Sequence, residues 1–397
     1  MVSIDHRHRL LRAQAREWGT EFRPLAPAVD RDPEAIRDHL GLAGVKFLST
    51  MGVPAAYRTP DRIGPYTFDG TTALERVIVM EELAAADAGV LVASPGPLLA
   101  GVLVQVLGDE RQQAWFYERM AAQQLWTCFA LTEPGRGSDA ASMLTSFTPA
   151  PDGGVTVEGE KRYIGNAARA QLAVVFGRTA PGPFGIGAVM LDTTAPGFTA
   201  HRIPTIGLRG LMLSAIRLDG VAIPPEQVLG RHLSPSRRGM WGFIRTFNLL
   251  RPAVAAIALG IARAAWRYVN DNRRDLTASE RHDLDRLRCR LDGTRRLVTL
   301  AASAVDERPE DGHLASAAKL SGARLAIDAT TLACSYFGPG ARLEHPLLDK
   351  LARDARATEF LEGTSHMQLL NLAHATVAGR LDPRCGSEPT SPARAPA

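Results

Sequence analysis

The sequence predicts an α+β fold in which an N-terminal helical domain, a middle β domain and a C-terminal helical bundle follow one another along 397 residues. Residues 1–120 are rich in helix-forming side chains, residues 121–232 contain short β-rich runs between glycine and proline turns, and residues 233–381 become helical again. The chain is too long for one simple core, so two or three packed domains are expected. Strands and helices do not alternate and no G-x-G-x-x-G follows a strand, which argues against a Rossmann nucleotide site.

The N-terminal helices are predicted by propensity and by their first turns. Asp32-Pro33 places proline at an early helical position, and Ala73–Ala86 consists of strong helix formers. Asp109–Met120 is amphipathic and begins with acidic residues. Val90–Leu107 has no charged residue but contains two prolines, so we expect a buried core helix after a proline-broken turn and no membrane span.

The middle and C-terminal regions differ in residue composition. Strands are predicted at Gly154–Val157, Leu172–Phe176, Ile186–Leu191 and Ala215–Leu218. Two Ala-rich stretches, Arg251–Val269 and His313–Ser335, predict closely packed helices. Residues 382–397 are rich in proline, serine and arginine and are predicted to be disordered.

The basic charge of the chain bears on its partners. The net charge is +4, and all but four of the 46 lysine and arginine residues are arginine. The forked guanidinium group of arginine binds phosphates and carboxylates through paired hydrogen bonds, so such a surface suits a phosphorylated cofactor, CoA or an acidic protein. A surface that is only solvated would have the same composition. The sequence has no dense basic run with interleaved aromatic residues, so nucleic-acid binding is not expected.

Cysteine usage predicts a cytoplasmic protein. Cys128, Cys289, Cys334 and Cys385 lie far apart and form no C-x-x-C pair, which argues against a disulfide framework or a metal site. The first residues, MVSIDHRHRLLRAQ, have no apolar core and are not expected to be a signal peptide.

A glycine-rich loop, LTEPGRGSD, is predicted at residues 131–139. Its backbone N–H and hydroxyl groups suit a polar ring or a phosphate, although an ordinary surface turn has the same composition. The segment resembles the T-E-P-x-x-G-S-D signature of the acyl-CoA dehydrogenase family. The resemblance implies that family's fold, with a β-barrel-like middle domain, and its cofactor FAD. It also implies that Phe129, Leu131, Thr132 and Ser138 lie against the flavin, with Ser138 near the thioester of the substrate.

The segment KRYIGN at residues 161–166 resembles the family's W-I-T-N segment. Tyr163 stands where tryptophan is usual and is implied to cover the flavin, as an aromatic ring can. Gly165 stands where threonine is usual, which removes a side-chain hydrogen bond. We expect the glycine to open space at the edge of the flavin, and that would favour reaction with oxygen.

The strongest resemblance lies in RDA at residues 353–355 followed by FLEGTS at residues 360–365. It implies that Glu362 removes the α-proton of an acyl thioester, while Thr364 and His366 contact FAD and Leu361 contacts the substrate. The chemistry requires a carboxylate in a dry pocket with its pKa raised by burial. Glycine after the glutamate permits a tight backbone turn. Taken alone, Glu362 would more commonly be a surface or helix-capping acid.

Other matches concern the substrate and a second subunit. Arg251-Pro252 resembles the family's arginine that opens a bundle helix near the substrate. Arg209 lies in a segment that matches the family only in part, and a role in a surface salt bridge would also explain this arginine. The resemblance implies that Arg273 or Arg274, together with the turn at Gly338, reaches the FAD of a neighbouring subunit. A homodimer or homotetramer is therefore expected.

The resemblance implies α,β-dehydrogenation of an acyl thioester on CoA or an acyl carrier protein, with a flavoprotein or oxygen as electron acceptor. The departures at Tyr163 and Gly165 are similar to those of family members that act on carrier-protein thioesters, which implies a secondary-metabolite pathway such as polyketide biosynthesis. Three alternatives stay open: an acyl-CoA oxidase, a flavin monooxygenase that does not need Glu362, and a non-catalytic protein on the same fold.

Overall fold

The computed structural model describes residues 4–380, and the predicted disordered tail at 382–397 lies outside them. Its N-terminal elements are α1 (His6–Arg31), η1 (Pro33–His39), α2 (Ala43–Thr50), α3 (Ala73–Ala93), α4 (Leu98–Leu107) and α5 (Glu110–Ala122). The predicted proline-broken turn separates α3 from the buried α4. The predicted helix with an acidic start is confirmed as α5, and Asp109 and Gln112 form a capping box at its first turn. The expectation of helices throughout this region is wrong for one segment, where β1 (Asp61–Ile63) and β2 (Tyr66–Phe68) form an antiparallel hairpin.

The middle region is one seven-stranded sheet. Its strands are β3 (Thr127–Ala130), β4 (Ser146–Pro149), β5 (Val155–Ile164), β6 (Leu172–Arg178), β7 (Ile186–Asp192), β8 (Phe198–Arg202) and β9 (Ser214–Ile223). β3 pairs in parallel with β6, whereas β5–β9, β8–β9 and β6–β7 are antiparallel. All four predicted strands are confirmed, and each extends further along the chain than predicted.

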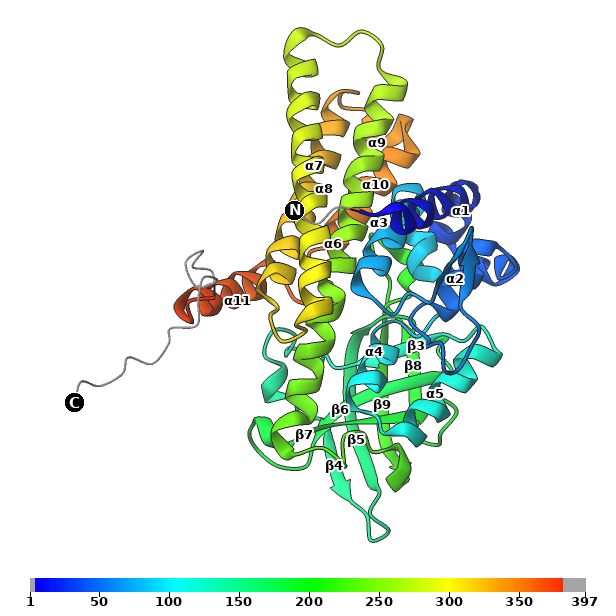
Figure 1. Cartoon of the computed structure of the whole chain (residues 1–397), viewed down its shortest axis with the longest axis vertical. Helices are drawn as coiled ribbons and strands as arrows, with labels where there is room; N and C mark the ends of the chain where they lie inside the picture. Colours follow the sequence, from blue (N-terminus) through cyan, green and yellow to red (C-terminus); the bar gives the residue numbers. More distant parts are fainter. Residues whose placement is uncertain (1–3, 381–397) are drawn as a thin grey trace, which may run out of the picture.

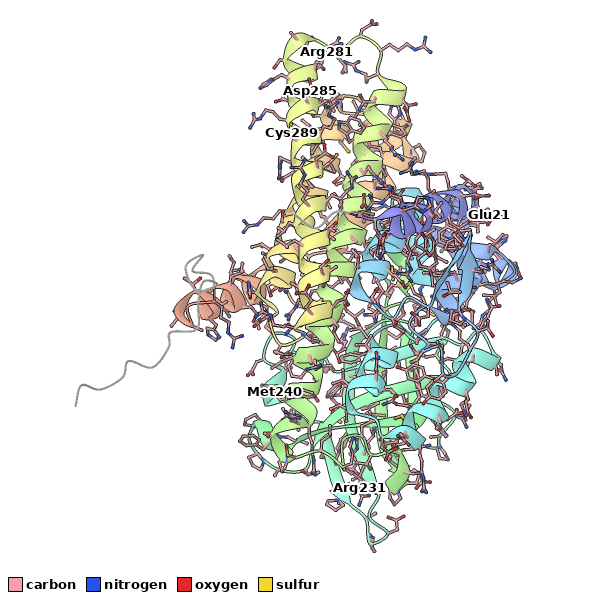
Figure 2. All side chains as sticks on the ribbon, viewed as in Figure 1. Glu21, Arg231, Met240, Arg281, Asp285 and Cys289 are labelled. Carbon is pink, nitrogen blue, oxygen red and sulfur yellow. The ribbon has the colours of Figure 1, made fainter. Side chains whose placement is uncertain are left out.

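The C-terminal region is a helical bundle built on α6 (Gly239–Asn272), α7 (Ala278–Glu307) and α8 (His313–Ser335). Figure 1 shows these long helices side by side, with the sheet around one end of α6 and the N-terminal helices along its flank. Short α9 (Ala341–Glu344) and α10 (Pro346–Ala357) follow, and α11 (Ser365–Val377) points away from the bundle. In Figure 2, Met240 marks the sheet end of α6, and Cys289 lies in the opposite half of the bundle.

Helix α6 forms the centre of the molecule. It packs against α3 and α8 through alanine and glycine, and residues 252–262 are all buried. It is long and apolar enough to cross a membrane by length and composition, and 89% of its most apolar window is buried inside the protein. A core helix of a globular protein has these properties. The predicted fold class is confirmed.

Candidate active site

Glu362 lies in the turn between α10 and α11, in a backbone conformation that is uncommon for a residue with a side chain. Its φ is +51°, and the next residue, Gly363, has φ +99°. This left-handed backbone favours glycine at position 363, as predicted, because a residue with a Cβ is strained there. Left-handed backbone at a non-glycine residue persists only where its surroundings hold it.

Several hydrogen bonds hold this turn. Arg251 Nε donates to the carbonyl oxygen of Glu362 at 3.3 Å. Nε2 of the buried Gln368 donates to the carbonyls of Glu362 and Gly363 at 3.2 and 3.0 Å. Lys319 Nζ donates to the carbonyls of Glu359 and Gly363 at 2.7 and 2.6 Å. The backbone on both sides of Glu362 is therefore fixed by side chains from α6, α8 and α11.

The carboxylate of Glu362 is chemically available. The residue is half-buried, but its Oε2 atom is buried and has no hydrogen-bond partner among the described residues. Burial raises the pKa of Glu362 to about 8, although the positive charges of Arg251, Lys319 and Arg76 oppose that rise. An unpaired carboxylate with a pKa near neutrality suits a general base.

The surrounding cations come from three helices. Arg76 lies on α3, Arg251 on α6 and Lys319 on α8, and all three are buried. Burial lowers the pKa of Lys319 to about 8, although Glu359 and Glu362 raise it. Arg76, Lys319 and Gln368 were not among the site residues predicted from the sequence. A signal existed for Lys319, because it is the one lysine within the Ala-rich His313–Ser335 helix.

An aromatic group lies beside Arg251. The Arg251 guanidinium stands 5.5 Å from the ring centre of Phe247, and Phe247 lies 5.8 Å from Phe129 between ring centres. Phe243 and Phe176 complete the group. The predicted flavin contact Phe129 on β3 and the predicted substrate contact Arg251 on α6 are thus connected through one side chain.

The glycine-rich loop is anchored by a buried ion pair. Lys161 Nζ donates to Oε1 of Glu133 at 2.9 Å and to the carbonyl of Leu131 at 3.0 Å. Glu133 also accepts from the backbone N–H groups of Leu144 and Thr145. The loop's base is therefore rigid, while Ser138 at its far end is exposed.

The two predicted flavin segments of the β domain meet through the backbone. Arg162 N donates to the carbonyl of Thr132 at 2.9 Å, which brings Tyr163 beside the glycine-rich loop. Tyr163 has φ +63° and is 56% exposed, so its ring is free to cover a ligand.

Gly165 does not open space as expected. A Cβ at this position would lie 2.8 Å from Cδ1 of Leu211, so that leucine fills the space a larger residue would need. The backbone N–H of Asn166 also donates to the carbonyl of Leu211 at 2.8 Å. The absent threonine side chain is replaced by packing from the 207–213 segment.

That segment is tied to the helix that precedes Glu362. Asp354 Oδ1 accepts from Leu208 N at 2.7 Å, and Arg353 Nη1 donates to the carbonyl of Ile206 at 2.8 Å. Arg209 lies 3.8 Å from Oδ2 of Asp30, in agreement with the salt-bridge alternative. The predicted motif residues Arg353 and Asp354 therefore connect the bundle to the β domain.

The remaining predicted residues fall into two groups. Thr364 caps α11, His366 is exposed on its first turn, and Leu361 packs against the core, so these three stay beside Glu362 in the chain. Arg273 ends α6, 22 residues after Arg251, which corresponds to about 33 Å along a helix. Arg274 follows it, exposed.

Gly338 shares the distant end of the bundle with Arg273. Arg273 lies 3.3 Å from Glu280, whose carbonyl accepts from the hydroxyl of Tyr336, two residues before Gly338. The structure therefore brings Arg273 and Gly338 to one end of the bundle and separates both from Glu362 of the same chain.

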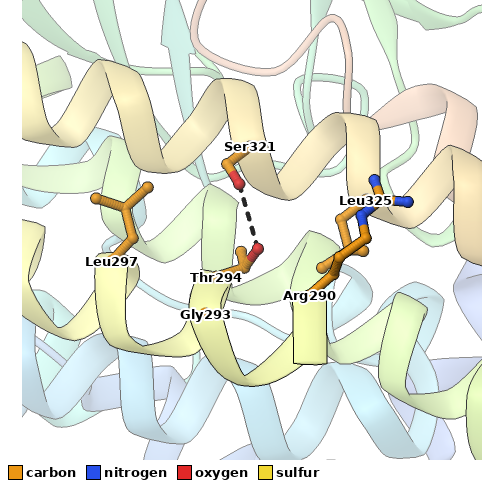
Figure 3. Close-up of a pocket in the computed structure, with 6 residues that line it drawn as sticks. All are labelled: Arg290, Gly293, Thr294, Leu297, Ser321 and Leu325. Carbon is orange, nitrogen blue, oxygen red and sulfur yellow. Dashed lines mark hydrogen bonds between the residues drawn. The ribbon is translucent and has the colours of Figure 1, made fainter. Parts of the chain in front are cut away.

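A further cavity of about 280 Å³ lies between α7 and α8 and does not belong to this site. Figure 3 shows Thr294 and Ser321 at its centre, with their hydroxyl oxygens 3.2 Å apart. Its other lining residues are Arg290, Gly293, Leu297 and Leu325.

Comparisons with known proteins agree with this geometry. Residues 128–221 match the family described as acyl-CoA dehydrogenase, middle domain, and residues 237–377 match acyl-CoA dehydrogenase, C-terminal domain. The human mitochondrial short-chain specific acyl-CoA dehydrogenase is 30% identical over 94% of this chain and 90% of the relative.

Solved structures share the fold. Butyryl-CoA dehydrogenase from Megasphaera elsdenii is 27% identical with a TM-score of 0.81, over 95% of this chain and all of that one. The prolyl acyl carrier protein oxidase AnaB is 20% identical with a TM-score of 0.83, over 94% of this chain and all of that one. The second likeness concerns the fold alone. The matched domains, the relative at 30% identity and the shared three-part fold together establish that this chain belongs to the acyl-CoA dehydrogenase family of FAD-dependent oxidoreductases that act on CH–CH bonds.

Proposed function

We propose that this protein catalyses α,β-dehydrogenation of an acyl thioester, with Glu362 as the base that removes the α-proton. The observation that carries the proposal is the carboxylate itself: its Oε2 is buried with no hydrogen-bond partner in residues 4–380, and its pKa is raised to about 8. A carboxylate that served only structure would have its oxygens satisfied by donors. Here Arg251 and Gln368 donate to the backbone carbonyl of Glu362 instead, so the carboxylate stays available to bind a substrate.

The chain's residues divide the work of the reaction. Glu362 takes the α-proton onto its carboxylate, which must be ionised beforehand. Arg251 and Gln368 orient the carboxylate by fixing its backbone, and the buried cations favour its ionised form. The aromatic group around Phe247 excludes water from one side of the site.

The residues of the β domain fit a flavin. A more than half-exposed Tyr163 ring stands beside a loop with an exposed hydroxyl at Ser138, and the base of that loop is anchored by Lys161 and Glu133. Tyr163, Thr132 and Ser138 would hold the flavin ring. When bound, FAD accepts the hydride that leaves the β-carbon, a step for which no side chain is suited.

A second copy of the chain would complete the cofactor site. Arg273 and Gly338 lie at the far end of the bundle from Glu362, so within one chain they are too distant to contact the same flavin ring. We propose a homo-oligomer in which these residues bind the phosphate end of a partner's FAD, since arginine forks onto phosphate.

The proposed carrier is an acyl carrier protein, in a secondary-metabolite pathway, with CoA as the alternative carrier. The shared fold with a prolyl acyl carrier protein oxidase supports this choice, as does a basic charge that is almost entirely arginine. The same neighbour makes oxygen a candidate electron acceptor, and a flavoprotein is the other candidate.

The test is the visible spectrum of the purified flavoprotein without oxygen, recorded before and after addition of matched acyl-CoA and acyl-carrier-protein thioesters. We expect the flavin band to bleach with the carrier-protein thioester, and Glu362→Gln to slow bleaching about a thousandfold or more, because general-base removal is costly. Admission of air then separates the acceptors, since an oxidase forms hydrogen peroxide rapidly, whereas the reduced flavin of a dehydrogenase reacts with oxygen slowly. A flavin that no thioester reduces, or full activity in Glu362→Gln, would contradict the proposal.

A further inference from the structure

A pocket of about 390 Å³ opens on the flank of the molecule, between α1, α6 and α7, with α3 as its floor. This volume lies within the range of small-molecule sites, about 300–1,000 Å³. The pocket is separate from the site described above, since Arg263 on its wall follows Arg251 by 12 residues of α6, about 18 Å along the helix.

Three helices each contribute two arginines to the wall of this pocket. The pairs are Arg12 and Arg16 on α1, Arg263 and Arg267 on α6, and Arg288 and Arg295 on α7. Residues four apart on a helix lie on the same face, and like charges at this spacing destabilise a helix. Six guanidinium groups therefore converge on one concave surface.

Carboxylates neutralise the inner part of the cluster. Glu82 is fully engaged: Arg263 donates to its oxygens at 2.9 and 2.7 Å, and Arg16 donates at 3.3 Å. Burial raises the pKa of Glu82, but hydrogen bonds and charge from Arg263 and Arg16 outweigh that effect and lower it to about 2. Glu81 pairs with Arg263 and Arg295.

The outer part of the cluster is short of negative charge. Six guanidinium groups face three carboxylates, those of Glu81, Glu82 and the exposed Asp292. Arg267 and Arg288 are exposed and have no carboxylate partner among residues 4–380. Nε of Arg12 and Nε of the 94%-buried Arg263 are buried without an acceptor among the same residues. The pocket therefore offers the exposed guanidinium groups of Arg267 and Arg288 and three positive charges in excess.

We propose that this pocket binds a diphosphate group. Guanidinium forks bind phosphate oxygens in pairs, and two linked phosphates present such pairs to more than one helix at once. The pocket is lined by only two apolar residues, Trp266 and Leu291, so its ligand is recognised by charge. Inorganic diphosphate and a nucleoside diphosphate share this chemistry.

The test is isothermal titration calorimetry of the FAD-saturated protein with sodium diphosphate and, separately, with ADP, at constant ionic strength. The test variant is Arg267→Gln/Arg288→Gln, which removes two exposed arginines of the pocket. The control variant is Arg286→Gln/Arg324→Gln, which removes two exposed arginines of α7 and α8 outside the pocket. Both variants lose the same net charge.

We expect stoichiometric binding of at least one ligand to the wild type, weakened about tenfold or more in the test variant and little changed in the control. If ADP binds more tightly than diphosphate, the pocket recognises a nucleoside diphosphate. If the two bind equally, the pocket recognises only the diphosphate group. Absence of binding by both ligands, or equal weakening in both variants, would overturn the proposal. Thioester-dependent bleaching of the flavin is expected to persist in the test variant, so failure here is distinguishable from failure of the proposed function.

Discussion

Glu362 experiences two opposing effects, burial and the charge of nearby cations, and burial dominates. The pKa of its carboxyl rises to about 8 although Arg251, Lys319 and Arg76 each lower it. A base with a raised pKa is mostly protonated at pH 7, so the reaction needs the minor, ionised form.

This balance predicts a rise of kcat/KM with pH. Below about pH 8 the free enzyme holds Glu362 protonated and inactive, and activity increases tenfold per pH unit until the carboxyl ionises. The measurement is the initial rate of flavin reduction by an acyl thioester at low substrate concentration from pH 6 to pH 9.5. A flat profile through this range would show that Glu362 ionises well below 7 or is not the base.

Lys319 is predicted to be a positioning residue that acts through Glu362. Lys319→Met removes two donors to the carbonyls that flank the base and one positive charge near it. Loss of that charge raises the pKa of Glu362 further, so the rise in kcat/KM moves to higher pH. Lys46→Met, at an exposed site, is the matched control and leaves the profile in place. An unshifted profile in a folded Lys319→Met protein would contradict this role.

At the scale of elements, the segment at 163–166 and the segment at 207–213 form one packed unit. Gly165 accommodates Leu211, and Asp354 holds Leu208 from α10. Tyr163, the proposed cover of the flavin, is thereby connected to the helix that precedes the proposed base, Glu362.

Gly165→Thr is predicted to be destabilising in this background. The backbone at Gly165 is not left-handed, so the obstacle is the clash of a Cβ with Leu211 at 2.8 Å. Overpacking of this kind costs about 1–3 kcal/mol. Urea unfolding and the flavin content of the purified protein measure the effect. The double variant Gly165→Thr/Leu211→Ser recovers stability, and a single variant as stable as the wild type would show that Leu211 moves aside freely.

At the scale of the whole molecule, the site residues lie in two separated groups. Glu362 and its neighbours occupy the middle of the bundle, and Arg273 and Gly338 occupy its far end. A cofactor site that needs both groups requires two chains.

Mixed variants test this arrangement. Neither Glu362→Gln nor Arg273→Ala/Arg274→Ala is expected to support thioester oxidation alone. When the two are unfolded and refolded together, random pairing gives hybrid dimers with one intact site, so about a quarter of the wild-type activity returns. Mixed protein as inactive as the separate variants would place Arg273 and Arg274 outside the partner's site.

Local features of the sequence determined the order of elements and the candidate base. The helix that starts at Asp109, the proline-broken turn before α4 and the four predicted strands depend on neighbours in the chain, and the structure confirms them. The Gly363 turn is equally local, because its positive φ needs glycine whatever packs around it. The β1–β2 hairpin was missed because three-residue strands carry little periodicity.

Tertiary structure alone decided what surrounds that base. Lys319 donates to the carbonyl of Gly363 across 44 residues of sequence, and Leu211 fills the space beside Gly165 across 46. Arg12 and Arg263 line one pocket only because α1 and α6 both pack against α3. Such contacts follow from how helices and sheet pack, which no local pattern encodes. The sequence therefore identified the carboxylate. Packing decided the pKa of that carboxylate, the side chains that support it and the arginine pocket, because desolvation and charge depend on three-dimensional neighbours.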